Sequence, residues 1–138
     1  MNALRNSQVL LVDNDRSVRE SLKNALETEG LAVCAIPGDE EAVHRFAAGC
    51  FDLVLLDFSA NESGQWNLLN SFRRVNPDVK VIIITVVREL VPAALATGAV
   101  NAFEKPLRIP ELLLSVRNIL TPPEAVPGTA SCAGARQD

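Results

Sequence analysis

The chain has 138 residues, of which 48% are hydrophobic and 22% charged, and its formal net charge is −4. This length suits one domain with one core, and the composition is typical of a soluble globular protein. The acidic balance argues against direct, sequence-independent binding of nucleic acid, which requires a basic surface. No apolar run reaches the ~18 residues of a membrane span, and residues 1–7 lack a signal-peptide core. We therefore expect a cytoplasmic protein with no membrane contact.

Five apolar runs predict five β-strands. The run at 79–85 is β-branched at almost every position, a composition typical of strands. Another run ends abruptly in the carboxylate of Asp57, and such continuous apolar runs are typical of strands that are buried on both faces. The predicted strands are residues 8–12, 31–36, 51–57, 79–85 and 100–104.

Between these runs, apolar residues recur at helical spacing, which predicts five helices. Asn14 or Asp15 can cap the first helix, and Asp39 can cap the second. A loop of small and polar residues, 58–65, separates the third strand from the third helix, which Trp66 opens. The predicted helices lie between residues 15 and 30, 39 and 49, 66 and 75, 92 and 97, and 110 and 120.

This alternation of strands and helices predicts an α/β fold with a parallel sheet covered on both faces. Right-handed crossovers and short connections favour a doubly wound sheet, which has a switch point where ligands bind. The composition changes after Thr121 to Pro, Gly, Ala and Ser. We therefore expect one domain over residues 1–121 and a flexible tail or linker over residues 122–138.

Polar residues follow four of the predicted strands. The first strand is followed by Asp13 and Asn14, and the others end at Asp57, Thr85 and Lys105. All of them fall at the carboxyl edge of the predicted sheet. If these strands are neighbours, the side chains converge on one pocket.

The chemistry of such a pocket follows from its residue types. Carboxylates close together repel unless a cation intervenes, and Mg²⁺ prefers oxygen ligands. An Asp carboxylate can also act as a nucleophile toward phosphorus and form an acyl phosphate. A lysine and a metal ion would stabilise the phosphoryl oxygens during in-line transfer. The pattern therefore indicates phosphoryl transfer to Asp57.

Over residues 7–120 the sequence resembles the receiver domain of two-component response regulators. The resemblance rests on four blocks in the same order, Leu11-Val12-Asp13-Asn14-Asp15, Leu55-Leu56-Asp57, Ile84-Thr85 and Glu104-Lys105-Pro106. It implies a flavodoxin-like, five-stranded parallel sheet in the order 2-1-3-4-5 with five helices. It also implies a phosphorylation switch rather than an enzyme, although such a domain assists its own phosphorylation and dephosphorylation.

The resemblance assigns roles to individual residues. Asp57 is expected to accept a phosphoryl group from a histidine kinase or a phosphotransfer protein. Thr85 is expected to swing toward the phosphoryl oxygens, Lys105 to pair with them, and the bond before Pro106 to be cis. The implied Mg²⁺ ligands are Asp13, Asn14, Asp57 and the backbone carbonyl of Ser59. The implied partner surface, for a dimer or an effector, is formed by the fourth helix, the fifth strand and the fifth helix.

Three positions depart from the family pattern. The family has two adjacent acids after the first strand, and Asn14 replaces the second, which predicts weaker Mg²⁺ binding. The loop after Asp57 lacks the usual proline. The position three residues before Lys105, often aromatic in the family, is Ala102, which predicts an altered route from the site to the partner surface.

Two alternatives remain open at the sequence level. The first is a degenerate receiver that serves as a protein-interaction module with little phosphorylation. The second is a phosphohydrolase with Asp13 as its nucleophile, since Asp13-Asn14-Asp15 resembles the D-x-D pattern of haloacid dehalogenases. That family requires an acidic pair after the lysine, whereas Glu111 is isolated here. A P-loop nucleotide enzyme is excluded because the sequence contains no G-x-x-x-x-G-K-[ST].

Overall fold

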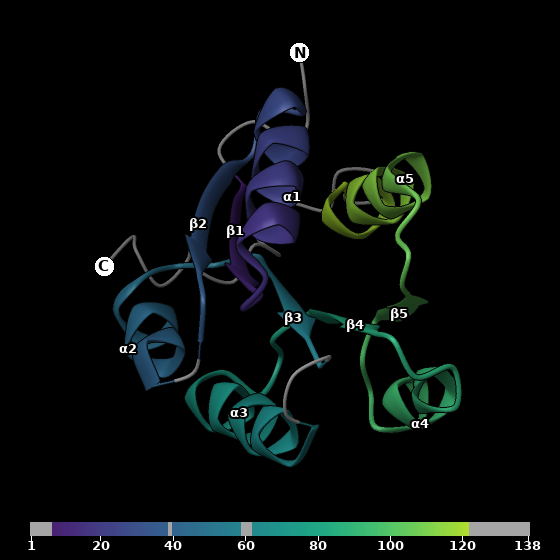
Figure 1. Cartoon of the computed structure of the whole chain (residues 1–138). Helices are drawn as coiled ribbons and strands as arrows, with labels where there is room; N and C mark the ends of the chain where they lie inside the picture. The colour runs from purple at the N-terminus through teal and green to yellow at the C-terminus, as the bar shows by residue number, and fades with distance from the viewer. Residues whose placement is uncertain (1–6, 39, 59–61, 122–138) are drawn as a thin grey trace.

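The computed structural model describes residues 7–38, 40–58 and 62–121. These residues form a five-stranded parallel sheet in the order β2-β1-β3-β4-β5, as predicted (Figure 1). The strands are β1 (Gln8–Val12), β2 (Ala32–Ile36), β3 (Leu53–Asp57), β4 (Val81–Thr85) and β5 (Asn101–Glu104). The helices are α1 (Arg16–Thr28), α2 (Glu40–Ala48), α3 (Glu62–Val75), α4 (Leu90–Ala96) and α5 (Ile109–Leu120).

The helices lie on the two faces of the sheet, α1 and α5 on one and α2, α3 and α4 on the other (Figure 1). Two apolar clusters match this division. Alternate strand residues such as Leu11 and Leu55 pack with Leu22 of α1 and Val116 of α5, whereas Leu56 packs on the opposite face with α3. Every residue of β3 and β4 is buried, as expected for central strands covered on both sides.

The first helix begins as the sequence predicts. Asp15 is its N-cap, and its side chain accepts a hydrogen bond from the backbone N–H of Val18 at 3.2 Å. Gly30 follows the helix with a φ of 93°, a conformation that glycine adopts without steric cost. Asp39, the predicted cap of the second helix, lies outside the described residues, as does the predicted tail over residues 122–138.

The third helix begins earlier than predicted. It starts at Glu62, so residues 62–65 are helical rather than part of the predicted loop 58–65. The sequence Glu62-Ser63-Gly64-Gln65 has no apolar residue to mark helical periodicity, and Gly64 is a weak helix former. The fourth helix likewise begins at Leu90 rather than Pro92. Four predicted strands, at 31–36, 51–57, 79–85 and 100–104, start one or two residues later in the structure.

Candidate functional site

The polar side chains at the strand ends are buried together at one edge of the sheet. Among the described residues, the buried polar or charged ones are Asp13, Asp57 and Thr85, with 1%, 4% and 0% exposure. β1 pairs with β3 up to Leu56, and β3 pairs with β4 through Asp57 and Ile84. Because the three strands are neighbours, the residues that end them reach the same pocket.

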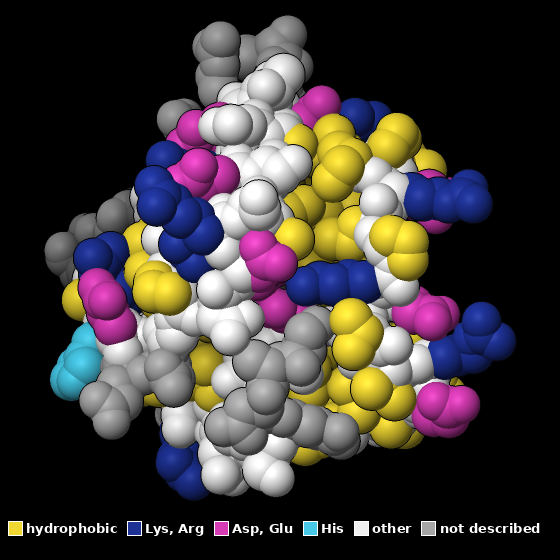
Figure 2. Space-filling model, viewed as in Figure 1, with side chains coloured by type: hydrophobic (Ala, Val, Ile, Leu, Met, Phe, Trp, Pro, Cys, Tyr) yellow, Lys and Arg dark blue, Asp and Glu magenta, His cyan; other side chains and the backbone are white. Residues whose placement is uncertain are grey.

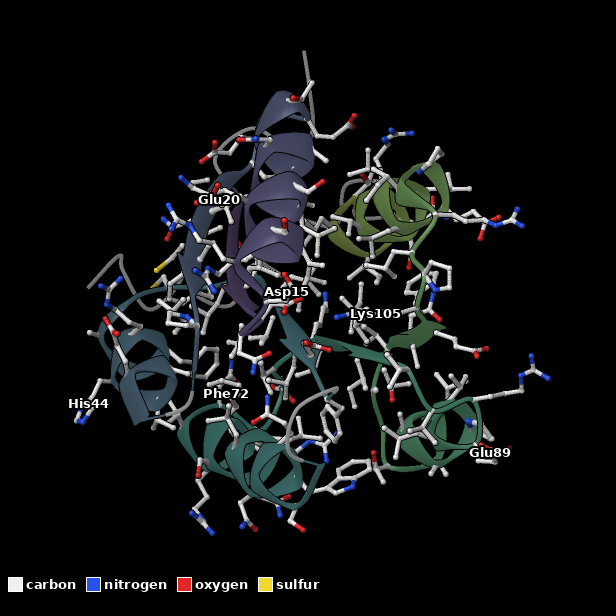
Figure 3. The ribbon with its side chains drawn as sticks, viewed as in Figure 1. Asp15, Glu20, His44, Phe72, Glu89 and Lys105 are labelled. Atoms are coloured by element: carbon white, nitrogen blue, oxygen red, sulfur yellow. The ribbon has the colours of Figure 1, made fainter. Side chains whose placement is uncertain are left out.

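Lys105 completes this pocket from the end of β5. Its Nζ lies 3.3 Å from Oδ2 of Asp57 and 3.8 Å from Oδ2 of Asp13. Figure 3 shows its side chain directed toward the centre of this edge of the sheet. Its backbone N–H donates to the carbonyl of Thr85 at 2.7 Å, and its bond to Pro106 is cis, as the resemblance implied. One ammonium group therefore faces two buried carboxyl groups.

Asp13 is a buried carboxyl group of the pocket whose charged form is disfavoured. Burial raises its pKa from 3.8 to about 6, and the neighbouring Asp57 raises it as well, whereas the backbone N–H of Asp15 and the Lys105 ammonium lower it. Its Oδ1 accepts the Asp15 N–H at 2.9 Å. Its Oδ2 is the one buried side-chain oxygen or nitrogen of the described residues that lacks a hydrogen-bond partner. A buried oxygen without a donor is suited to a cation.

The predicted metal ligands are only partly brought together. Asp13 and Asp57 share the pocket, and Asn14 follows Asp13 as an exposed residue at the rim. Ser59 lies outside the described residues. No group of three or more His, Cys, Asp or Glu residues suited to a metal occurs in the described part of the chain. The oxygen donors fit a hard cation such as Mg²⁺, but the amide of Asn14 leaves the set with two carboxylates.

Thr85 lies at the end of β4, fully buried. Its Oγ1 accepts a hydrogen bond from the backbone N–H of Val87 at 3.0 Å. This bond ties the hydroxyl to the chain that leads into α4. A displacement of the Thr85 hydroxyl would therefore release the Val87 amide and alter this connection.

Two contacts near the site involve residues for which no role was predicted. Nη1 of Arg19, on α1, donates to the backbone carbonyl of Asp13 at 2.8 Å. Nε2 of Gln65, on α3, donates to the backbone carbonyl of Asp57 at 2.8 Å. Neither residue belongs to a spacing pattern that would have marked it, and Gln65 falls in the stretch predicted to be a loop.

The strand order and the polar residues gathered at one edge define a flavodoxin-like α/β domain with an acidic pocket at its switch point. The family model described as the response regulator receiver domain matches residues 9–117. The chain therefore belongs to the receiver domain family of two-component response regulators, and it is a signal-receiving domain. In the described part of the chain, no helix is long and apolar enough to cross a membrane.

Individual relatives support this assignment. The chain is 30% identical over 114 residues to the swarming motility regulation protein RssB of Serratia marcescens, covering 80% of this chain and 52% of RssB. It thus spans about half the length of that curated relative.

Two solved structures from Thermotoga maritima share the fold. A response regulator is 31% identical, with a TM-score of 0.75 and coverage of 85% of this chain and 99% of that chain. The response regulator TrrA, solved in complex with Mg²⁺-BeF, is 26% identical, with a TM-score of 0.73 and coverage of 82% and 98%.

Proposed function

We propose that Asp57 accepts a phosphoryl group from a histidine kinase or a phosphotransfer protein. The observation that carries this proposal is the position of Asp57 at the end of β3, 3.3 Å from the Lys105 ammonium and beside Asp13. A carboxylate oxygen of Asp57 attacks phosphorus, the bond from phosphorus to the donor nitrogen breaks, and an acyl phosphate forms. The leaving imidazole then takes up a proton.

The other residues of the pocket assist this transfer. Lys105 offsets the negative charge of the phosphoryl oxygens, and the Thr85 hydroxyl leaves the Val87 amide to donate to one of them. In this way the domain promotes its own phosphorylation and, with water as the nucleophile, its own dephosphorylation, without turning over a separate substrate.

Asp13, Asn14, Asp57 and the carbonyl of Ser59 are the residues that would hold Mg²⁺. The buried Oδ2 of Asp13, which accepts no hydrogen bond, supports such a site. Bound Mg²⁺ would supply positive charge to the phosphoryl oxygens, in addition to the charge of Lys105. We expect weaker binding than in a receiver with two acids after β1, since affinity follows the charge of the ligand set. TrrA, solved with Mg²⁺-BeF, is a relative in which such a group is bound.

Two grooves support contacts with other proteins. One, of about 360 Å³, lies between α1 and α5 beside Lys105 and is lined by apolar residues that include Val18, Leu107 and Ile109. In Figure 2, hydrophobic side chains flank the central basic side chain on this face. This groove would receive the phosphodonor protein, because it opens next to the proposed acceptor.

The second groove, of about 440 Å³, lies on the face formed by α4, β5 and α5. It is lined by Val91, Pro92, Ala102 and Phe103, with charged residues at its rim, Arg88, Glu104, Arg108 and Glu111. An apolar floor with a rim of both charges suits a protein partner, either a second copy or an effector. Phosphorylation would alter this face through Thr85 and the Val87 amide that it binds.

The test is phosphorylation with a small phosphodonor such as acetyl phosphate in the presence of Mg²⁺, read by intact mass. We expect a gain of one phosphoryl group that hydroxylamine removes, and no gain in Asp57→Asn. Absence of the adduct in the wild type would contradict the proposal and favour an interaction module that retains only the fold. An adduct that persists in Asp57→Asn would show that another residue accepts the phosphoryl group.

A further inference from the structure

Gln65 lies in the first turns of α3 and contacts the proposed acceptor through its backbone. Its Nε2 donates to the carbonyl oxygen of Asp57 at 2.8 Å, in a partly buried position. β1 pairs with β3 only as far as Val12 and Leu56, so Asp57 extends one residue beyond that ladder. A side chain from α3 therefore binds the carbonyl of Asp57, a residue that still pairs with β4 but no longer with β1.

Trp66, which follows Gln65 in α3, contacts Phe58, which follows Asp57. The ring of Trp66 packs edge-on against Phe58, with 4.7 Å between the centroids and an interplanar angle of 78°. The backbone N–H of Phe58 donates to the carbonyl of Ile84 on β4 at 2.7 Å. Asp57 and Phe58 are thus fixed from two sides, by β4 and by the start of α3.

The sequence shows why such fixation matters in this chain. The stretch from Phe58 to Gly64 contains no proline, the residue that limits backbone freedom most by fixing φ. In-line attack on phosphorus depends on the position of the attacking oxygen, and small displacements lower the rate. The contact that restricts the Asp57 backbone therefore bears on the rate of phosphorylation.

We infer that Gln65 is a positioning residue that holds the backbone of Asp57 in place for phosphoryl transfer. This inference rests on the proposed function of Asp57. It extends that function to a side chain that need not touch the phosphoryl group. The competing role is purely structural, in which the hydrogen bond adds stability to the start of α3 and leaves the rate unchanged.

Two substitutions separate these roles. Gln65→Met keeps the length of the side chain and removes the donor, and Gln65→Glu keeps the shape and replaces the donor with a carboxylate. Gln8→Met is the matched control, because Gln8 lies at the amino end of β1, at the opposite edge of the sheet. Leu26→Val, in the core under α1, is a second control that lowers stability away from the site.

The rate of phosphorylation by acetyl phosphate is measured at saturating Mg²⁺, together with the free energy of unfolding and the ¹³C shift of the Asp57 carbonyl. We expect both Gln65 variants to lower the rate about 3- to 10-fold, the size of one neutral hydrogen bond. The carbonyl shift should change in both. Gln8→Met and Leu26→Val should keep the rate within about twofold, although Leu26→Val unfolds more easily.

Three outcomes would overturn the inference. One is a wild-type rate in the Gln65 variants together with lower stability, which would indicate a structural role. Another is a loss of rate in Gln65→Glu alone, which would indicate an effect of charge. The third is a wild type that takes up no phosphoryl group, which would overturn the proposed function as well, whereas the first two would leave it intact.

Discussion

The acceptor pocket and the face formed by α4, β5 and α5 are built on different principles. In the pocket, Asp13 and Asp57 are almost fully buried, and each faces Lys105 within 4 Å, at 3.8 and 3.3 Å. In the helices that form the face, large apolar side chains stay exposed, with Leu95 of α4 at 45% and Leu114 of α5 at 53%. The ion pair between Arg88 and Glu104 on this face has a similar distance, 3.5 Å, but both of its side chains are exposed to solvent.

This contrast indicates which features the fold itself determines. Strand order brings the pocket residues together, so few side chains suffice to define it. The face depends on the size of each side chain, and a small residue such as Ala102 leaves a groove there. Substitutions in the pocket should therefore act on phosphoryl transfer and electrostatics. Substitutions on the face should act on how phosphorylation at the pocket alters the partner surface.

The largest effect is expected for Lys105→Met, which keeps most of the apolar stem and removes the charge. We expect the rate of phosphorylation by acetyl phosphate to fall about 100-fold, because one preorganised positive group is lost at the site where negative charge concentrates. Lys80→Met is the matched control, since Lys80 precedes β4 at the opposite edge and is exposed. A rate within threefold of the wild type would place Lys105 outside the transfer step.

The second effect concerns stability and pH. The folded-state pKa of Asp13 lies above its ordinary value, at about 6 against 3.8, so the folded protein binds more protons between these values and loses stability as pH rises through them. Asp13→Asn removes this cost. We expect its free energy of unfolding at pH 7.5, without Mg²⁺, to exceed that of the wild type by about 1–3 kcal/mol.

The gain should shrink as pH falls toward 4 and disappear at still lower pH, below the ordinary value of 3.8, where Asp13 is protonated in both states. The control is Asp52→Asn, because the Asp52 carboxylate accepts a hydrogen bond from the Gln8 N–H at 2.8 Å and its loss should not stabilise the fold. Denaturant unfolding at several pH values provides the measurement. A gain of the same size at pH 4 and pH 7.5 would exclude the titration of Asp13 as its cause.

The difference between features set by backbone topology and features set by single side chains also explains how much of the structure the sequence alone predicts. The strand runs predicted a doubly wound parallel sheet, and the resemblance to receiver domains implied its strand order. The polar residues that end the strands then predicted the pocket of Asp13, Asp57 and Lys105, because neighbouring parallel strands end at the same edge of the sheet. The start of α3 was predicted wrongly, since Glu62 to Gln65 show no apolar periodicity. The contact from Gln65 to Asp57 joins a side chain to a backbone carbonyl eight residues away, and no residue pattern marks such a bond.

A smaller effect is expected for Asn14→Asp, which restores the second acid after β1. We expect Mg²⁺ to bind about 5- to 10-fold more tightly, since one more carboxylate joins the ligand set at a solvated rim. The fluorescence of Trp66, which packs on Phe58 next to the site, can follow the titration. Asn24→Asp on the exposed side of α1 is the matched control. Equal affinities for wild type and Asn14→Asp would refute the predicted weakening.

The smallest effect on chemistry is expected for Ala102→Tyr, which tests the partner face alone. Ala102 is buried beside the groove of about 440 Å³, so a ring placed there can fill the groove next to Val91. We expect the phosphorylation rate to stay within about twofold, because the pocket keeps its charged groups.

The ring should instead link the end of β4 to α4, so that more α4 amide resonances shift when Mg²⁺ and beryllofluoride are added. Ala93→Tyr on the exposed side of α4 should leave that response unchanged. A tenfold loss of rate in Ala102→Tyr would mean that pocket and face are not separable, and the contrast between them would fail.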